Sequence, residues 1–370
     1  MYIVDEDQLQ QCADALLTSD LFFIDTEFES RRSGTELCLL QISDGERAYL
    51  VDAIELDDLR PLAAALGRED VCWVVHAGRQ DVGLLMDALD LEERPRIFDT
   101  QVAWSMLSAE YQVSLSYVKM RVIGSRQDKG SQTSNWKRRP LTEDQLTYAL
   151  GDVECLPKIH EYLSKSLTDL RRLDACFHAS AETFEKRVVT RDDVTLSSYR
   201  NLWQLTAKQQ AGLRVLLEWH NRFGGQRGSP HWKTLFNIAA AEPKDVDALS
   251  DIKGVSRSWS RTDGAKLITQ MAEAMSCIDD SVEVPTSQPS PYATFDQHYR
   301  EAWLVGARAD ICATEHIAPE LAFPGWLMKR LRAVVHDVNN PTLLADEFTG
   351  WRSLLKPAWE RFCRETSEHD

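Results

Sequence analysis

Between residues 21 and 98, short apolar runs alternate with segments of helical spacing, and this alternation limits the possible folds more than any other feature of the chain. Asp44-Gly45 is a hairpin signal between two of the runs. An opening meander followed by alternating helices and strands predicts an α/β domain with a mixed sheet flanked by helices. The runs with the length of strands are 21–24, 37–43, 47–51, 71–75 and 96–98, and the helical segments are 56–66 and 81–89.

The remainder of the chain has a helical pattern that a proline-rich segment interrupts. Thr142 and Gln145 form a capping-box pattern, Pro157 ends or kinks the helix that follows, and a long helix is expected over 158–186. Three prolines and few apolar groups mark a linker at 281–294. We therefore predict an α/β domain over 1–190, helical domains over 200–280 and 295–370, and the linker 281–294 between the helical domains.

The net charge of −16 argues against a uniformly basic nucleic-acid binder, but it does not locate charge. Residues 121–139 hold six basic side chains against one acidic, and residues 201–233 hold five against one. Such stretches can contact phosphates, or they can be solvated surface. The sequence has no apolar run long enough for a membrane span, no secretion signal at its N-terminus and eight scattered cysteines, so we expect reduced thiols, no membrane and the cytoplasm.

Three short motifs carry the candidate chemistry. Asp25 and Glu27 follow an apolar strand and point to one side of it, because residues i and i+2 share a strand face. Asp81 falls on the first turn of an expected helix, after a small-residue turn that begins at His76. Tyr148 and Asp152 share a helical face at spacing i, i+4. Each motif alone is commonly incidental, and we interpret His76 as a hydrogen-bonded structural residue.

Together the motifs predict a two-metal site. Four clustered carboxylates repel one another and require cations, and oxygen-only ligands suit Mg²⁺ or Mn²⁺. Two such ions can stabilise both the attacking and the leaving oxygen of a phosphodiester. Tyr148 would orient or deprotonate the attacking water.

These motifs resemble those of the DEDDy subclass of the DEDD 3′-5′ exonucleases, and the chain resembles bacterial ribonuclease D. The likeness covers about residues 1–165 and implies a ribonuclease H-like fold, with Asp25, Glu27, Asp81 and Asp152 as metal ligands and Tyr148 on the water. The helical parts resemble HRDC domains, more weakly than the first part resembles the nuclease. The segments that carry the likeness are Phe23 to Phe28, Leu39 to Ile42, Val75 to Gly78, Phe98 to Gln101, and Asn135 to Leu141.

The resemblance implies a 3′-5′ exoribonuclease that acts as a monomer on RNA, such as tRNA precursors with a single-stranded 3′ end. Residues 31–36 lack the aromatic and proline residues usual in the family, which leaves substrate preference open. Trp136 could equally belong to the core, and Gln41 could be structural. The candidate RNA contacts are Phe28, Gln41, Arg126, Lys129, Trp136, Lys137, Arg138, Arg139, Lys208, Arg222 and Arg227.

Three alternatives stay open at this point. The same acids serve a 3′-5′ DNA exonuclease. A catalytically inactive nucleic-acid-binding protein would have lost one of the five residues, and none is lost. An unrelated α/β enzyme has no support, because the sequence has no P-loop, no GxGxxG after a strand and no GxSxG.

Overall fold

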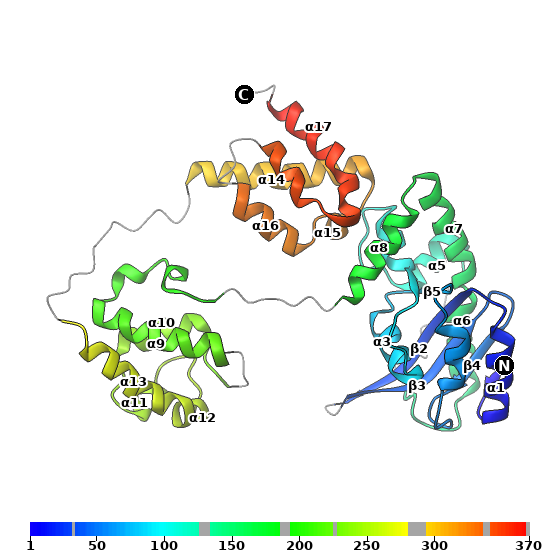
Figure 1. The fold of residues 1–370 in the computed structure, drawn as a ribbon, viewed down its shortest axis with the longest axis horizontal. Coiled ribbons are helices and arrows are strands. Elements are labelled where there is room, and N and C mark those ends of the chain that lie inside the picture. Colours follow the sequence, from blue (N-terminus) through cyan, green and yellow to red (C-terminus); the bar gives the residue numbers. More distant parts are fainter. Residues whose placement is uncertain are drawn as a thin grey trace. The chain divides into compact units, whose positions relative to one another are not determined.

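The chain forms two compact units in the computed structural model, one made of residues 1–186 with 297–370 and the other of residues 187–296 (Figure 1). The structure describes residues 1–31, 34–125, 134–185, 193–224, 228–279, 294–335 and 341–367.

Within the described residues, a six-stranded mixed sheet organises the first unit, in the strand order β1-β4-β3-β2-β5-β6. Strands β2, β3 and β4 form an antiparallel meander. At the free edge of β2, β5 pairs parallel with β2 and β6 pairs parallel with β5. The mixed sheet predicted from the sequence is confirmed. The strands are β1 (Tyr2–Ile3), β2 (Leu21–Arg31), β3 (Gly34–Ser43), β4 (Ala48–Asp52), β5 (Cys72–Val75) and β6 (Arg96–Asp99).

Helices cover both faces of this sheet. One face, with Phe22 and Ile24 of β2, packs on α1, α2 and α3. The other face, with Phe23, packs on α4, α5, α7 and α8, while α6 covers β3 and β4 beside them. The α-helices are α1 (Glu6–Leu16), α2 (Ala63–Leu66), α3 (Arg79–Leu89), α4 (Thr100–Ser105), α5 (Leu115–Ile123), α6 (Glu143–Glu154), α7 (Leu156–Asp169) and α8 (Leu173–Phe184), with a 3-10 turn η1 (Arg60–Leu62) before α2.

Two helices differ from the sequence prediction. The long helix expected over 158–186 is wrong, because α7 ends at Asp169 and α8 starts at Leu173. Arg171 between them adopts a left-handed φ of 56°, which no helix continues through. The helix expected over 56–66 shortens to η1 and α2, since Pro61 starts a new turn there.

Residues 297–370 complete the first unit and share a hydrophobic core with residues 1–186, in which Phe98 and Trp359 are both fully buried. Two partly buried ion pairs join the parts: Arg172 to Glu315 at 2.8 Å and Arg352 to Glu182 at 2.8 Å. The segment predicted as a separate helical domain is thus helical but not separate. Its elements are α14 (Phe295–Glu315), α15 (Pro319–Ala322), α16 (Gly325–Val335), η5 (Pro341–Glu347), η6 (Gly350–Leu355) and α17 (Lys356–Ser367).

The second unit has its own small core, in which Leu213 and Leu216 of one long helix face Leu235 and Trp259. It is helical, as predicted. Its elements are the 3-10 turns η2 (Leu196–Ser198) and η3 (Leu202–Gln204), the helices α9 (Ala207–Phe223), α10 (Trp232–Ala241), α11 (Val246–Ser250), α12 (Arg257–Trp259) and α13 (Ala265–Ser276), and the π-helical turn η4 (Ser260–Gly264).

The eight cysteines all lie in the described residues and none is in a disulfide, and most of them are buried, as the sequence indicated. None of the helices in the described parts of the chain is both long and apolar enough to cross a bilayer.

Candidate active site

Strand β2 brings Asp25 and Glu27 to the sheet face that α6 covers. Asp25 pairs across β2 and β3 with Gln41, and Glu27 pairs with Leu39, a residue that packs under α6. The register shifts just after Glu27, where Phe28 pairs with Leu37 and the pairing therefore skips Cys38. Such a shift bends the strand locally and can aim a side chain, here beside the second acidic residue.

A tight turn delivers Asp81 to the same region. The turn leaves β5 through Ala77, whose φ is 53°, and Gly78, where a Cβ would lie 2.6 Å from the Val75 side chain. The buried Asp99 carboxylate accepts hydrogen bonds from the backbone N–H of Ala77 at 3.0 Å and of Gly78 at 3.2 Å. Asp81 then occupies the first turn of α3 and accepts a hydrogen bond from the Thr26 hydroxyl.

Helix α6 presents Tyr148 and Asp152. Its N-terminus has the predicted capping box, in which Thr142 Oγ1 accepts from Gln145 N–H at 3.2 Å and Gln145 Oε1 accepts from Thr142 N–H at 3.0 Å. The rings of Trp136 and Tyr148 pack with centroids 6.2 Å apart. Asp152 is buried, while Tyr148 stays half-buried.

The electrostatics show that these side chains gather in one place. Burial raises the pKa of Asp25 well above its ordinary value, and the charges of Asp81, Asp152 and Glu27 raise it further. Burial, followed by the charges of Asp152 and Asp81, raises the pKa of Glu27 to about 8. Burial also raises the pKa of Tyr148, helped by the charges of Asp152, Glu27 and Asp25 and by a hydrogen bond with Asp152.

The donor set of this cluster fits divalent cations. The carboxylates offer only oxygen ligands, and cations would relieve the repulsion that raises their pKa values. Among the described residues, however, no group of three or more His, Cys, Asp or Glu side chains has the arrangement of a metal site. The four carboxylates are a candidate metal site by their charge and donor type alone.

His76 has the structural role that we inferred for it. Its Nδ1 lies 2.9 Å from Thr100 Oγ1, and its Nε2 lies 2.9 Å from the Val113 carbonyl oxygen. Both ring nitrogens are thus engaged away from the acids.

Several predicted RNA contacts are exposed or partly exposed. Phe28 is half-buried on β2, and Arg138 is exposed. Lys137 forms an ion pair with Glu36 of β3. In the second unit, Lys208 is half-buried on α9, and Arg222 is exposed in the last turn of α9. Arg126, Lys129 and Arg227 lie outside the described residues.

Three predicted RNA contacts are instead buried or engaged. Trp136 is 2% exposed and belongs to the core, one of the two readings that the sequence allowed. Gln41 is fully buried and pairs with Asp25 across the strands, so its side chain does not face solvent, which fits the structural reading that the sequence also allowed. The prediction that Arg139 holds phosphate is wrong, because its Nε donates to the fully buried Asp52 at 2.6 Å and the two form an ion pair.

The Asp52–Arg139 pair predicts a pH dependence of stability. Burial raises the pKa of Asp52, but hydrogen bonds from Arg139, Tyr2 and Ile54 outweigh burial, so the pKa lies below its ordinary value. A carboxylate with a depressed pKa in the folded state stabilises the fold at neutral pH, and this contribution is lost as the pH falls through that pKa. We expect Asp52→Asn to lower the free energy of unfolding by about 3–5 kcal/mol at neutral pH, the cost of breaking a buried ion pair.

Urea unfolding of wild type and Asp52→Asn checks this at about pH 7 and again at about pH 3, below the ordinary pKa of an aspartate. The difference in free energy of unfolding between wild type and Asp52→Asn should shrink at the lower pH. An equal difference at both pH values would show that the charge of Asp52 does not contribute to the stability of the fold.

Sequence reasoning missed Asp52, Asp99 and Thr26. Asp52 and Asp99 are single acids that end apolar strands, and a buried acid at a strand end is the signal that could have found them. Thr26 stands between the two acids of the first motif, where its hydroxyl reaches Asp81 across the strand end.

The comparisons with known proteins agree with this fold. Residues 1–168 match the 3′-5′ exonuclease family, so this α/β part of the chain is a 3′-5′ exonuclease domain. A ribonuclease D from Zymomonas mobilis subsp. mobilis is 30% identical over 282 residues, which cover 74% of this chain and 72% of the relative. A ribonuclease D from Gluconacetobacter diazotrophicus is 29% identical over 339 residues, covering 90% of this chain and 84% of the relative.

The chain belongs to the ribonuclease D family. The crystal structure of Escherichia coli RNase D, described as an exoribonuclease involved in structured RNA processing, superposes with a TM-score of 0.64 at 25% identity, covering 99% of this chain and 98% of that one. The protein is therefore a 3′-5′ exoribonuclease.

Proposed function

We propose that the protein hydrolyses phosphodiesters at RNA 3′ ends with the carboxylates Asp25, Glu27, Asp81 and Asp152, as a member of the DEDDy subclass, and releases 5′-mononucleotides. The observation that carries this proposal is the mutual electrostatic influence of those four carboxylates and Tyr148. Residues far apart in sequence interact in this way only when the fold brings them together.

In this proposal the four carboxylates hold two divalent ions, Mg²⁺ or Mn²⁺. When bound, these ions would stabilise the charge on the attacking and leaving oxygens of the phosphodiester. The Thr26 hydroxyl donates a hydrogen bond to Asp81 and holds its carboxylate in place. The register shift after Glu27 orients the Glu27 carboxylate. Tyr148 orients or deprotonates the attacking water, because its phenol shares the helical face of Asp152.

The proposed substrate is RNA with a single-stranded 3′ end, such as a tRNA precursor, and the proposed compartment is the cytoplasm. Arg138 is exposed in the segment that precedes α6, where it can hold a phosphate of the incoming strand. Phe28 lies one residue beyond Glu27 and can stack a terminal base. The helical unit 187–296 acts as an HRDC-type RNA-binding module, for which exposed Arg222 supplies one cation. The protein acts as a monomer.

An exonuclease assay tests the proposal. The substrates are a 5′-labelled single-stranded RNA, the matched DNA and a tRNA with a 3′ extension, each with Mg²⁺, Mn²⁺ or EDTA. We expect stepwise shortening and 5′-mononucleotides from both RNAs with either ion, and none with EDTA. Faster degradation of DNA than of RNA would favour a DNA exonuclease. RNA binding without degradation above an Asp25→Asn control would favour a binding protein.

A further inference from the structure

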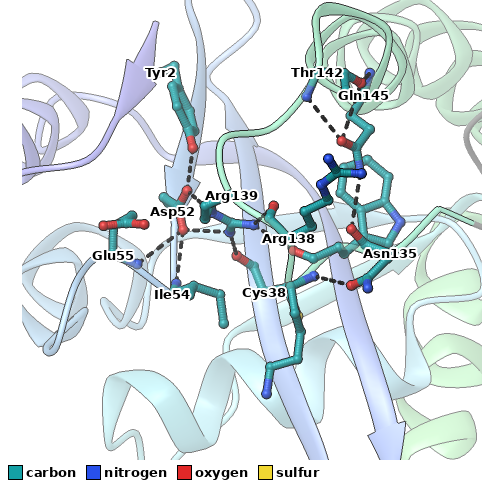
Figure 2. Close-up of polar contacts among 12 residues, drawn as sticks. Tyr2, Cys38, Asp52, Ile54, Glu55, Asn135, Arg138, Arg139, Thr142 and Gln145 are labelled. Atoms are coloured by element: carbon teal, nitrogen blue, oxygen red, sulfur yellow. Dashed lines mark hydrogen bonds and ion pairs between the residues drawn. The ribbon is translucent and has the colours of Figure 1, made fainter.

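A polar network links strand β4 to the segment that leads into α6 (Figure 2). At its centre is Asp52, the last residue of β4, whose carboxylate is fully buried. Asp52 Oδ1 accepts from the backbone N–H of Ile54 at 3.0 Å and of Glu55 at 3.2 Å, and Oδ2 accepts from the Tyr2 hydroxyl. Two further bonds come from Arg139, Nε to Oδ2 and Nη2 to Oδ1, both at 2.6 Å.

The rest of the Arg139 guanidinium is equally engaged. Its Nη1 donates to the carbonyl oxygens of Trp136 at 2.6 Å and of Arg138 at 3.0 Å. Its Nη2 also donates to the carbonyl oxygen of Cys38 at 3.0 Å. A guanidinium has five N–H donors, and these bonds use all five. None is left for a phosphate.

Two of these acceptors, Cys38 and Trp136, lie beside a proposed catalytic residue. Cys38 is the residue that the pairing skips opposite Glu27, so Arg139 holds the irregular point of β3 in place. Trp136, whose carbonyl Arg139 also holds, packs its ring against Tyr148. Asn135, one residue earlier, accepts from Gln145 Nε2 at 3.4 Å and so ties the segment to the capping box of α6.

We propose that Asp52 and Arg139 are positioning residues for hydrolysis. The ion pair fixes the strand that faces Glu27 and the turn that packs on Tyr148, and so keeps these two side chains in reacting position. Neither partner touches the substrate. This inference rests on the proposed roles of Glu27 and Tyr148.

Lysine cannot replace this arginine. Two planar bonds to one carboxylate and three to carbonyl groups in different directions need the fixed fork of a guanidinium, and an ammonium is a compact point charge with three donors. Arg139→Lys should therefore fail to restore the function that Arg139→Met loses, whereas a residue that only supplies positive charge to RNA would tolerate lysine.

Steady-state hydrolysis of single-stranded RNA by Arg139→Met, Arg139→Lys and Asp52→Asn tests the proposal, with Arg172→Met as the matched control. Arg172 also forms an ion pair, and its side chain is 12% exposed, against 13% for Arg139. We expect kcat to fall about a hundredfold in the first three variants, the effect of a small misplacement of reacting groups. KM and the salt dependence of binding should stay within about twofold of wild type, because no phosphate contact is lost. Arg172→Met should keep the wild-type kcat.

Two further measurements separate the proposal from its alternatives. A double-mutant cycle compares kcat in Arg139→Met, Tyr148→Phe and the double variant. The fold-loss of kcat in the double variant should be far smaller than the product of the two single losses, because both residues act on one step. Hydrogen exchange should show faster exchange at the start of α6 in Arg139→Met, without any substrate.

A raised KM with a shallower salt dependence and an unchanged kcat would make Arg139 a phosphate ligand and overturn the proposal. Independent effects in the double-mutant cycle, or an equal kcat loss in Arg172→Met, would also overturn it. If Tyr148→Phe alone leaves kcat unchanged, the proposed role of Tyr148 is wrong, not that of Arg139. A second double-mutant cycle, of Arg139→Met with Glu27→Gln, then tests whether Arg139 acts through Glu27. Where Arg139→Met does not fold, Asp52→Asn decides, since it keeps the shape of the side chain.

Discussion

Asp25→Asn should lower the rate of RNA hydrolysis by about a thousandfold or more. Asp25 lies at the centre of the acidic cluster, because the charges of Asp81, Asp152 and Glu27 all act on it. In the proposed two-metal site, losing one charged ligand would remove several kcal/mol of transition-state stabilisation, and about 4 kcal/mol corresponds to a thousandfold in rate. Single-turnover hydrolysis of a 5′-labelled RNA at saturating Mg²⁺ measures the effect.

The same substitution should leave the fold intact and stabilise it in metal-free buffer. The pKa of Asp25 is raised by burial and by repulsion, so its charged form destabilises the folded state at neutral pH. Neutral asparagine removes that cost, and thermal unfolding should show a higher midpoint. The control is Asp58→Asn, an exposed aspartate paired with Arg60 outside the site, which should keep wild-type activity. Activity above about a tenth of wild type in Asp25→Asn would contradict the assignment of Asp25 as a ligand.

Tyr148→Phe should lower kcat by about 10²–10⁴-fold, the usual contribution of a group that orients or deprotonates a nucleophile. The ring keeps its contact with Trp136, so α6 should stay in place and only the hydroxyl is lost. KM should change little, because the phenol acts on water rather than on RNA. Initial rates over a range of RNA concentrations separate kcat from KM.

The matched control is Tyr162→Phe on α7, a tyrosine that is 51% exposed and outside the site. It should behave as wild type. An unchanged kcat in Tyr148→Phe would mean that a group other than Tyr148 orients or deprotonates the attacking water. An unchanged kcat with a raised KM would instead place the phenol on the substrate.

Five of the six strands, all except β1, and the five candidate catalytic residues could be predicted because their signals are local. Asp25 and Glu27 follow an apolar run, Asp81 follows a small-residue turn, and Tyr148 and Asp152 stand one helical turn apart after a capping box. Each signal occupies a few neighbouring residues, and strand and helix periodicity decide which side chains share a face. The structure then brings the five into one electrostatic cluster.

The parts that could not be predicted depend on partners far apart in sequence. Arg139 lies in a basic stretch and was expected to meet RNA, whereas its partner Asp52 lies 87 residues earlier. Charge counts cannot distinguish a cation that faces solvent from one that neutralises a buried acid. The break between α7 and α8 was missed for a different reason, since Arg171 adopts a left-handed conformation without a glycine or proline to mark it.

The sharing of one core by residues 1–186 and 297–370 has a consequence for biosynthesis. A chain leaves the ribosome in sequence order, and its domains generally fold as units during synthesis. The intervening residues 187–296 have a core of their own and can mature as soon as they emerge. The nuclease portion must instead await the later segment, so the nascent chain exposes apolar surface on α8 until η6 arrives to pack against it.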